Sequence, residues 1–243
     1  MNNIAYEITI SGRVQGVGFR PFIYNLAKKY DIKGFVTNNA NGVLINAVAD
    51  KNSVAAFYEQ IFLQKPRSSE ITSSLKKEIP ETEIFYYFFI KPTATNLFID
   101  IPLTPDFAIC ENCSAEMLDT KNHRYYYPFT TCTACGPRYT ITKKFPFERI
   151  NTSIDEFEMC ESCSKEYRSS DDLRFHSQTN SCPNCGIRLK FTDNAGEIIS
   201  RSNTEIFKII VEKLAMGKII ALKNTAGYLL ICDADNEEAV KQL

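Results

Sequence analysis

Eight of the nine cysteines form two quartets with the same spacing, and no other feature restricts the fold of this chain as strongly. Each quartet reads C-x2-C-x18-C-x2-C, and the second repeats the first 50 residues later. Two residues between cysteines allow a tight turn that directs both sulfurs at one ion, and four thiolates complete a tetrahedral Zn2+ site without an open position. The eight are Cys110, Cys113, Cys132, Cys135, Cys160, Cys163, Cys182 and Cys185.

We interpret the quartets as two structural Zn2+ sites, because small loop-rich units bury too little apolar surface to fold without a metal. Iron–sulfur clusters are the alternative metal. Pairing within each quartet is the simplest arrangement, and a cross-braced arrangement that shares cysteines between quartets stays open. His123 and His176 lie between the paired cysteines, but four thiolates already saturate each ion. Flanking residues repeat at the same interval, as Arg124 and Arg174 do, which indicates internal duplication of one unit.

Composition limits the classes of function. Lys and Arg total 28 and Asp and Glu total 29, so a net charge of −1 gives no electrostatic case for binding nucleic acid. No run of 18 apolar residues is present, so we expect no membrane span. Residues 1–7 lack the basic and apolar regions of a signal peptide. We therefore expect a cytoplasmic protein whose cysteines are thiols or metal thiolates rather than disulfides.

Residues 1–93 contain no cysteine, and their pattern predicts a ferredoxin-like β-α-β-β-α-β sandwich. Pro21 is expected to open the first helix, and Ser53 to cap the second. Asn41-Gly42 predicts a hairpin turn, because both residues tolerate positive φ. The polar segment 65–74 predicts an exposed loop. The predicted strands are 4–10, 34–37, 43–49 and 84–90.

A glycine-rich loop joins the first predicted strand to the first helix. Gly12, Gly16 and Gly18 let the backbone curl so that several N–H groups point into one concavity, and the helix N-terminus adds partial positive charge. Arg20 adds a planar bidentate donor for phosphate oxygens. This combination predicts a phosphate-binding loop.

The string Gly12-Arg13-Val14-Gln15-Gly16-Val17-Gly18-Phe19-Arg20 resembles the signature of the acylphosphatase family, and Gly34-Phe35-Val36-Thr37-Asn38 resembles its second signature. The resemblance implies that Arg20 and the loop amides hold an acyl phosphate while Asn38 orients the attacking water. No strong general base is evident, so catalysis would rest on positioning and charge stabilisation. The implied phosphate-binding residues are Val14, Gln15, Gly16, Val17, Gly18, Phe19 and Arg20.

The cysteine region, over residues 106–141 and again over 175–186, resembles the paired zinc fingers of the NiFe-hydrogenase maturation carbamoyltransferases. In that family an acylphosphatase domain precedes the tandem fingers and a YrdC-like domain follows them. We therefore expect an α+β chain with three parts. They are a ferredoxin-like acylphosphatase sandwich at 1–93, a loop-rich tandem zinc-finger region at 106–190, and the incomplete start of an α/β YrdC-like domain at 203–243.

The resemblance implies a hydrogenase maturation carbamoyltransferase that hydrolyses carbamoyl phosphate to supply the carbamoyl group for the cyanide ligand of the hydrogenase iron. In the full-length family ATP serves the YrdC-like domain, and the last domain passes the carbamoyl group to an acceptor cysteine of a maturation partner protein. The family's chains are several times longer, so this chain is either a fragment or a truncated product, and we expect it to keep only the hydrolysis. The alternative is a truncated, non-catalytic zinc-binding docking or scaffold module.

Overall fold

The structure is a computed structural model that describes residues 3–80, 83–93 and 101–243. The chain divides into two compact units, and segments of both cysteine repeats occur in each unit. None of the helices in the described ranges is long and apolar enough to cross a membrane. The first unit comprises Met1–Cys110, Thr131–Glu156 and Glu161–Asn180, and the second comprises Glu111–Thr130, Phe157–Cys160 and Ser181–Leu243.

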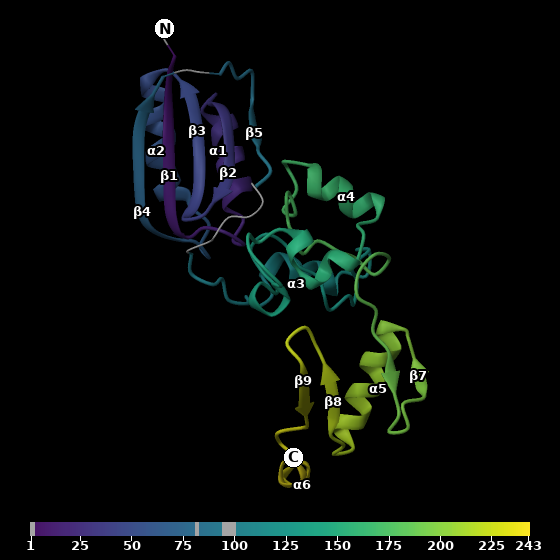
Figure 1. Cartoon of the computed structure of the whole chain (residues 1–243). Helices are drawn as coiled ribbons and strands as arrows, with labels where there is room; N and C mark the ends of the chain where they lie inside the picture. The colour runs from purple at the N-terminus through teal and green to yellow at the C-terminus, as the bar shows by residue number, and fades with distance from the viewer. Residues whose placement is uncertain (1–2, 81–82, 94–100) are drawn as a thin grey trace. The chain divides into compact units, whose positions relative to one another are not determined.

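The first unit contains a five-stranded sheet with the strand order β4-β1-β3-β2-β5, and two helices cover one of its faces (Figure 1). All neighbouring strands are antiparallel except β2 and β5. This is the ferredoxin-like sandwich that the sequence predicts. Its elements are β1 (Ile4–Arg13), α1 (Phe19–Lys29), β2 (Lys33–Asn39), β3 (Gly42–Ala49), α2 (Lys51–Gln64), β4 (Glu70–Ile79) and β5 (Phe88–Ile90).

Apolar residues on alternate positions of the strands build the core between the sheet and the helices. Ile8 and Ile10 of β1 are fully buried, whereas Glu7, which directly precedes Ile8, is exposed. The helices contribute residues at helical spacing, such as Ile23 of α1 and Phe57 of α2, both fully buried. Each buried side chain of this size contributes roughly 1.5–3 kcal/mol, so the sandwich has its own hydrophobic core.

The fourth strand of the sandwich is β4, and the prediction of an exposed loop over 65–74 is wrong from Glu70 onward. β4 pairs with β1 at the edge of the sheet, and most of its side chains are exposed. Because an edge strand with a solvated face carries polar residues, β4 lacks the apolar alternation that marks the other strands. Of the strand predicted at 84–90, only β5 forms, paired in parallel with β2.

The helix starts also differ in detail from the prediction. Asp50, not Ser53, is the N-cap of α2, and its carboxylate accepts hydrogen bonds from the backbone N–H groups of Asn52 and Ser53. Hydrogen bonds from Ser53, first from its hydroxyl, lower the pKa of Asp50. Helix α1 begins at Phe19, so Pro21 lies in its first turn rather than at its first residue.

Two eight-residue helices, α3 (Glu111–Leu118) and α4 (Glu161–Arg168), start 50 residues apart, as the predicted duplication requires. Residues 191–242 form two antiparallel hairpins and two helices within the second unit (Figure 1). Asn236 caps the last helix by accepting a hydrogen bond from the N–H of Ala239. These elements are β6 (Phe191–Thr192), β7 (Ile198–Ser200), α5 (Asn203–Ala215), β8 (Ile220–Lys223), β9 (Tyr228–Ile231) and α6 (Glu237–Gln242).

Gly34 is the position in the sheet where a side chain fits least. Its φ is +125°, and an added Cβ would lie 2.0 Å from the carbonyl oxygen of Asn46 on β3. We expect Gly34→Ala to lower the unfolding free energy by about 3 kcal/mol or more, because backbone strain and a backbone clash combine. The matched control is Gly196→Ala, whose φ is +87° but whose Cβ meets nothing within 4 Å. It should lose about 1–2 kcal/mol. Denaturant unfolding followed by circular dichroism measures both, and equal losses would contradict the clash.

Candidate functional site

The loop between β1 and α1 is anchored in the core by its apolar side chains. Val14, Val17 and Phe19 are each 1% exposed, so their side chains pack in the core and do not face a ligand. Gly16 and Gly18 have φ values of +72° and +73°, which favour glycine, and Gly18 is the N-cap of α1. The loop therefore turns tightly and leads directly into the N-terminus of the helix.

Gln15 fixes this loop to the β2–β3 hairpin, which lies at the same end of the sheet. Its Nε2 donates to the carbonyl oxygens of Asn39 at 3.1 Å and Gly42 at 2.8 Å, at the hairpin between β2 and β3. The backbone carbonyl of Gln15 accepts a hydrogen bond from the hydroxyl of Thr104 at 2.8 Å. A phosphate held by this loop would therefore meet the backbone of Gln15, Val17 and Phe19 and the side chain of Arg20. The N–H of Val14 already donates to the carbonyl of Gly12 at 3.0 Å.

Arg20 and Asn38 come from different elements but meet at one carboxylate oxygen. Arg20 lies in the first turn of α1, and its Nη1 lies 2.6 Å from Oε1 of Glu148. Asn38, near the end of β2, directs its Nδ2 at the same oxygen from 3.5 Å, and the hydroxyl of Thr93 donates to it at 2.7 Å. The side chains of Arg20 and Glu148 are 11% and 22% exposed. Three donors therefore converge on one position where an anionic oxygen lies.

The side-chain amide of Asn38 also contains an oxygen that can accept a hydrogen bond. Asn38 is 3% exposed, and its buried Oδ1 has no hydrogen-bond partner among the residues that the structure describes. A buried acceptor without a partner is costly, so such an atom indicates a bound water or ligand. A water that donates to this oxygen would lie beside the donors that converge on Glu148.

A small cavity lies beside the loop, and the imidazole ring of His176 forms part of its lining. It is lined by Gly16, Gly18, Arg20, Arg138, His176 and Gln178, among others. Burial lowers the pKa of His176 to about 4, the positive charge of Arg20 adds to this effect, and Glu148 opposes it. The imidazole is consequently neutral at pH 7 and places no second positive charge beside Arg20.

Arg138 joins the loop to the second cysteine pair of the first quartet. Its guanidinium is buried, and its Nε donates to the carbonyl of Gly16. The two terminal nitrogens donate to the carbonyls of Cys132, Thr133 and Cys135 at 3.1–3.2 Å. One planar side chain with five donors thus holds the loop at Gly16 and the turn of the cysteine pair in one fixed arrangement.

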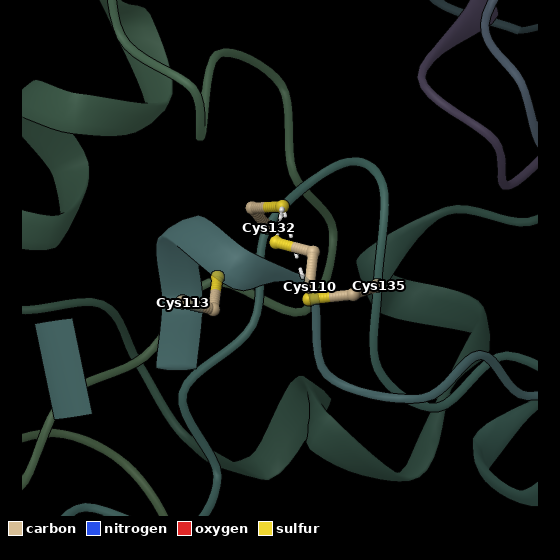
Figure 2. Close-up of side chains that lie close together, drawn as sticks. All are labelled: Cys110, Cys113, Cys132 and Cys135. Carbon is tan, nitrogen blue, oxygen red and sulfur yellow. Dashed lines mark hydrogen bonds between the residues drawn. The ribbon is translucent and has the colours of Figure 1, made fainter. Parts of the chain in front are cut away.

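The sulfurs within each quartet lie at the separations that a tetrahedral zinc site requires. A Zn–S bond of about 2.3 Å places two tetrahedral ligands roughly 3.8 Å apart. In the first quartet the Sγ atom of Cys132 is 3.7 Å from that of Cys110 and 3.8 Å from that of Cys135 (Figure 2). The second quartet repeats these distances, 3.7 and 3.8 Å, around Cys182. All ligand atoms of each quartet lie within 4.8 Å of one another.

Both quartets therefore fit a four-thiolate zinc site, and the pairing is sequential. Cys110, Cys113, Cys132 and Cys135 form one group, so the cross-braced alternative is wrong. Neither group includes His123 or His176, as predicted. In each repeat the first pair of cysteines lies at the start of a helix, α3 or α4, whose N-terminal partial charge stabilises thiolates.

Two buried arginines hold the repeats together in the same way. The Nε of Arg124 donates to the carbonyl of Ser181 at 3.0 Å, and the Nε of Arg174 donates to the carbonyl of Thr131 at 3.0 Å. The two donors, Arg124 and Arg174, are 50 residues apart in sequence, and so are the two acceptors, Thr131 and Ser181. Each arginine thus binds the residue that precedes the third cysteine of the other repeat.

Glu148, Thr93 and Arg138 are site residues that the sequence does not single out. Glu148 lies 128 residues after Arg20, in the stretch between the quartets. It belongs to neither acylphosphatase signature, and it is not part of the cysteine spacing that predicts the metal sites. Arg138 repeats as Arg188 in the second half, but nothing in that repetition indicates contact with the glycine-rich loop.

Two family models match separate stretches of the chain. The acylphosphatase model matches residues 6–90, and the HypF finger model matches residues 109–142 and 159–192. An acylphosphatase of Pseudothermotoga lettingae is 42% identical over 89 residues, 36% of this chain and 98% of that protein. The carbamoyltransferase HypF of Synechocystis sp. is 45% identical over 240 residues, 97% of this chain but 30% of that protein. The crystal structure of full-length HypF in the phosphate- and nucleotide-bound form gives a TM-score of 0.86 at 37% identity, covering 99% of this chain and 31% of that one.

An acylphosphatase domain that is followed by a duplicated four-cysteine finger defines the class of protein. The chain belongs to the HypF carbamoyltransferase family, and it matches the N-terminal part of that family's members. It spans about 30% of the length of the HypF relatives that it matches.

Metal content tests the two sites directly. We expect the purified protein to contain about two Zn2+ per chain, because each quartet is complete. Cys113→Ser should reduce this to about one and lower stability, because zinc binding contributes to folding. Cys232→Ser is the matched control, since Cys232 lies outside both quartets. Elemental analysis and thermal unfolding measure both effects, and a metal-free protein that stays folded in chelator would exclude structural zinc.

The low pKa of His176 predicts a dependence of stability on pH. The unfolded chain takes up the imidazole proton near pH 6.5, whereas the folded protein does so near pH 4. The unfolding free energy should therefore fall as pH drops from 7 to 5. His176→Asn should show a smaller fall, and Asn tolerates the φ of +55° at this position. Urea unfolding at both pH values in the presence of zinc provides the measurement. An identical fall in wild type and variant would contradict the assignment.

Proposed function

We propose that this chain carries the acyl phosphate-hydrolysing part of a HypF-type carbamoyltransferase, with carbamoyl phosphate as its substrate. The convergence of Arg20, Asn38 and Thr93 on Oε1 of Glu148 is the observation that supports this most directly. Donors that gather around a carboxylate oxygen are equally suited to an oxygen of a phosphate. Two of the three are the residues that the acylphosphatase resemblance assigns to catalysis.

The proposed reaction is a hydrolysis at phosphorus. The oxygen of a water bonds to phosphorus, the bond from phosphorus to the acyl oxygen breaks, and carbamate leaves with that electron pair while a proton passes to solvent. Arg20 and the backbone N–H groups of the loop from Gln15 to Phe19 would hold the phosphate oxygens and offset their charge. Asn38 would orient the water through its buried Oδ1, so that attack proceeds from a fixed position.

The two cysteine quartets would hold Zn2+ in a structural role, because four thiolates leave no position for substrate. They support the site at a distance, through the bonds of Arg138 to the second cysteine pair and to Gly16. One relative's structure is described as nucleotide-bound, and we propose that ATP and a maturation partner carrying an acceptor cysteine act on parts of the full-length family that lie beyond this chain.

Substitution of the two proposed catalytic side chains separates binding from turnover. Arg20→Lys keeps the charge but loses the planar fork, so kcat/KM for carbamoyl phosphate should fall about tenfold or more. Asn38→Ala should lower kcat by roughly a hundredfold while inhibition by inorganic phosphate stays nearly unchanged, because the loop amides and Arg20 remain. Release of inorganic phosphate from carbamoyl phosphate provides the assay.

Arg13→Lys is the matched control for Arg20→Lys. Arg13 also lies on the glycine-rich string, but its guanidinium binds the carbonyl of Ser68 and the carboxylate of Glu70, not Glu148. Arg13→Lys should leave kcat/KM for carbamoyl phosphate within about twofold of wild type. A wild-type protein that binds two zinc ions but releases no phosphate would exclude the hydrolytic proposal and favour the docking or scaffold module.

A further inference from the structure

Glu148 enters the site from the stretch between the two quartets, and the residues after it hold it there. The backbone N–H of Arg149 donates to Oε1 of Gln178 at 2.8 Å, and its guanidinium donates to the carbonyls of Gln178 and Asn180. The side chain of Asn151 is buried and donates to the carbonyl of Pro146 at 2.8 Å. Both sides of Glu148 are therefore anchored, which directs its carboxylate at Arg20.

This carboxylate occupies the position that a phosphate oxygen needs. Arg20 bonds to Glu148 in a largely buried environment, where charge interactions are strong. An incoming phosphate must therefore displace the carboxylate from Arg20 and tolerate its negative charge nearby. A small acylphosphatase that corresponds only to residues 6–90 has no equivalent of this residue, since Glu148 lies outside that match.

We propose that Glu148 is a specificity-determining residue of the acyl phosphate site, which competes with phosphate for Arg20 and favours acyl phosphates that bear an N–H donor. The inference rests on the proposed function and names the substrate class within it. Oε2 of Glu148 accepts no hydrogen bond from the residues that the structure describes, so this oxygen is available to a substrate. A carbamoyl group offers an –NH2 that donates to it, whereas an acetyl group offers only a methyl.

The physical basis of the selection is the cost of leaving the largely buried carboxylate of Glu148 without a hydrogen-bond donor. When phosphate takes Arg20, Glu148 loses its strongest donor. A carbamoyl N–H replaces part of that interaction, and a methyl group replaces none of it. Sites that hydrogen-bond a substrate N–H or O–H reject analogues that lack it far more strongly than apolar pockets reject a change of size.

Two substitutions separate the charge of Glu148 from its role as an acceptor. Glu148→Gln removes the charge and keeps an acceptor, and Glu148→Ala removes both. Isothermal titration with inorganic phosphate should give about tenfold tighter binding to both variants, since neither competes for Arg20 with a full charge. The ratio of kcat/KM for carbamoyl phosphate to that for acetyl phosphate should fall about tenfold in Glu148→Ala and less in Glu148→Gln.

Glu156→Gln is the matched control. Glu156 lies in the same stretch, but its carboxylate is largely exposed and pairs with Lys143 at 3.7 Å, so neither measurement should change. Zinc content and circular dichroism verify that each variant is folded. Unchanged phosphate affinity in both folded variants, or an unchanged substrate ratio in Glu148→Ala, would overturn the role of Glu148. If the wild type hydrolyses neither substrate, the proposed function fails, and phosphate titration still decides whether Glu148 competes for Arg20.

Discussion

The turn that carries Cys132 and Cys135 is the constraint on which the arrangement of the site depends. Carbonyl oxygens of this turn accept hydrogen bonds from the buried guanidinium of Arg138, which also binds Gly16 in the glycine-rich loop between β1 and α1. The Cβ of Thr133, within the same turn, lies 2.9 Å from where a Cβ on Gly18 would be. A metal that fixes the turn therefore fixes one wall of the loop as well. The quartet thus contributes to the geometry of a site that contains none of its own ligands.

The features that could be predicted from the sequence are those specified by residues close together in the chain. The loop from Gly12 to Arg20 and the cysteine pairs each depend on spacing within a short segment. The loop glycines have positive φ values that curl the backbone, and the cysteines gather in two quartets. The strand β4 could not be predicted, because its polar residues face solvent at a sheet edge and lack apolar alternation. Asp50, and not Ser53, caps α2. Aspartate and serine side chains both accept hydrogen bonds from the first N–H groups of a helix, so the sequence alone does not decide which of the two residues lies at the helix start.

The acidic residue in the site could not be predicted for a different reason. Glu148 approaches Arg20 across 128 residues of sequence, and no periodic pattern relates two such positions. Its placement depends on the anchoring of Arg149 and Asn151, which requires the folded cysteine region. Residues of the sandwich and Thr93 after it supply the donors, and the stretch between the quartets supplies the anionic group that lies against them. A chain of two modules thus builds a site that neither module specifies alone.

The reciprocal bonds of Arg124 and Arg174 have the form of an isologous interface within one polypeptide. In a symmetric dimer, residue i of one subunit binds residue j of the other, and j binds i in return. Here Arg124 binds Ser181 and Arg174 binds Thr131, which are equivalent pairs under a shift of 50 residues. The duplicated unit therefore presents a self-complementary surface, and covalent linkage replaces the concentration dependence of a dimer. Excision of one repeat would leave a buried arginine of the other without its carbonyl partner, so we expect each finger to depend on the other for its folding.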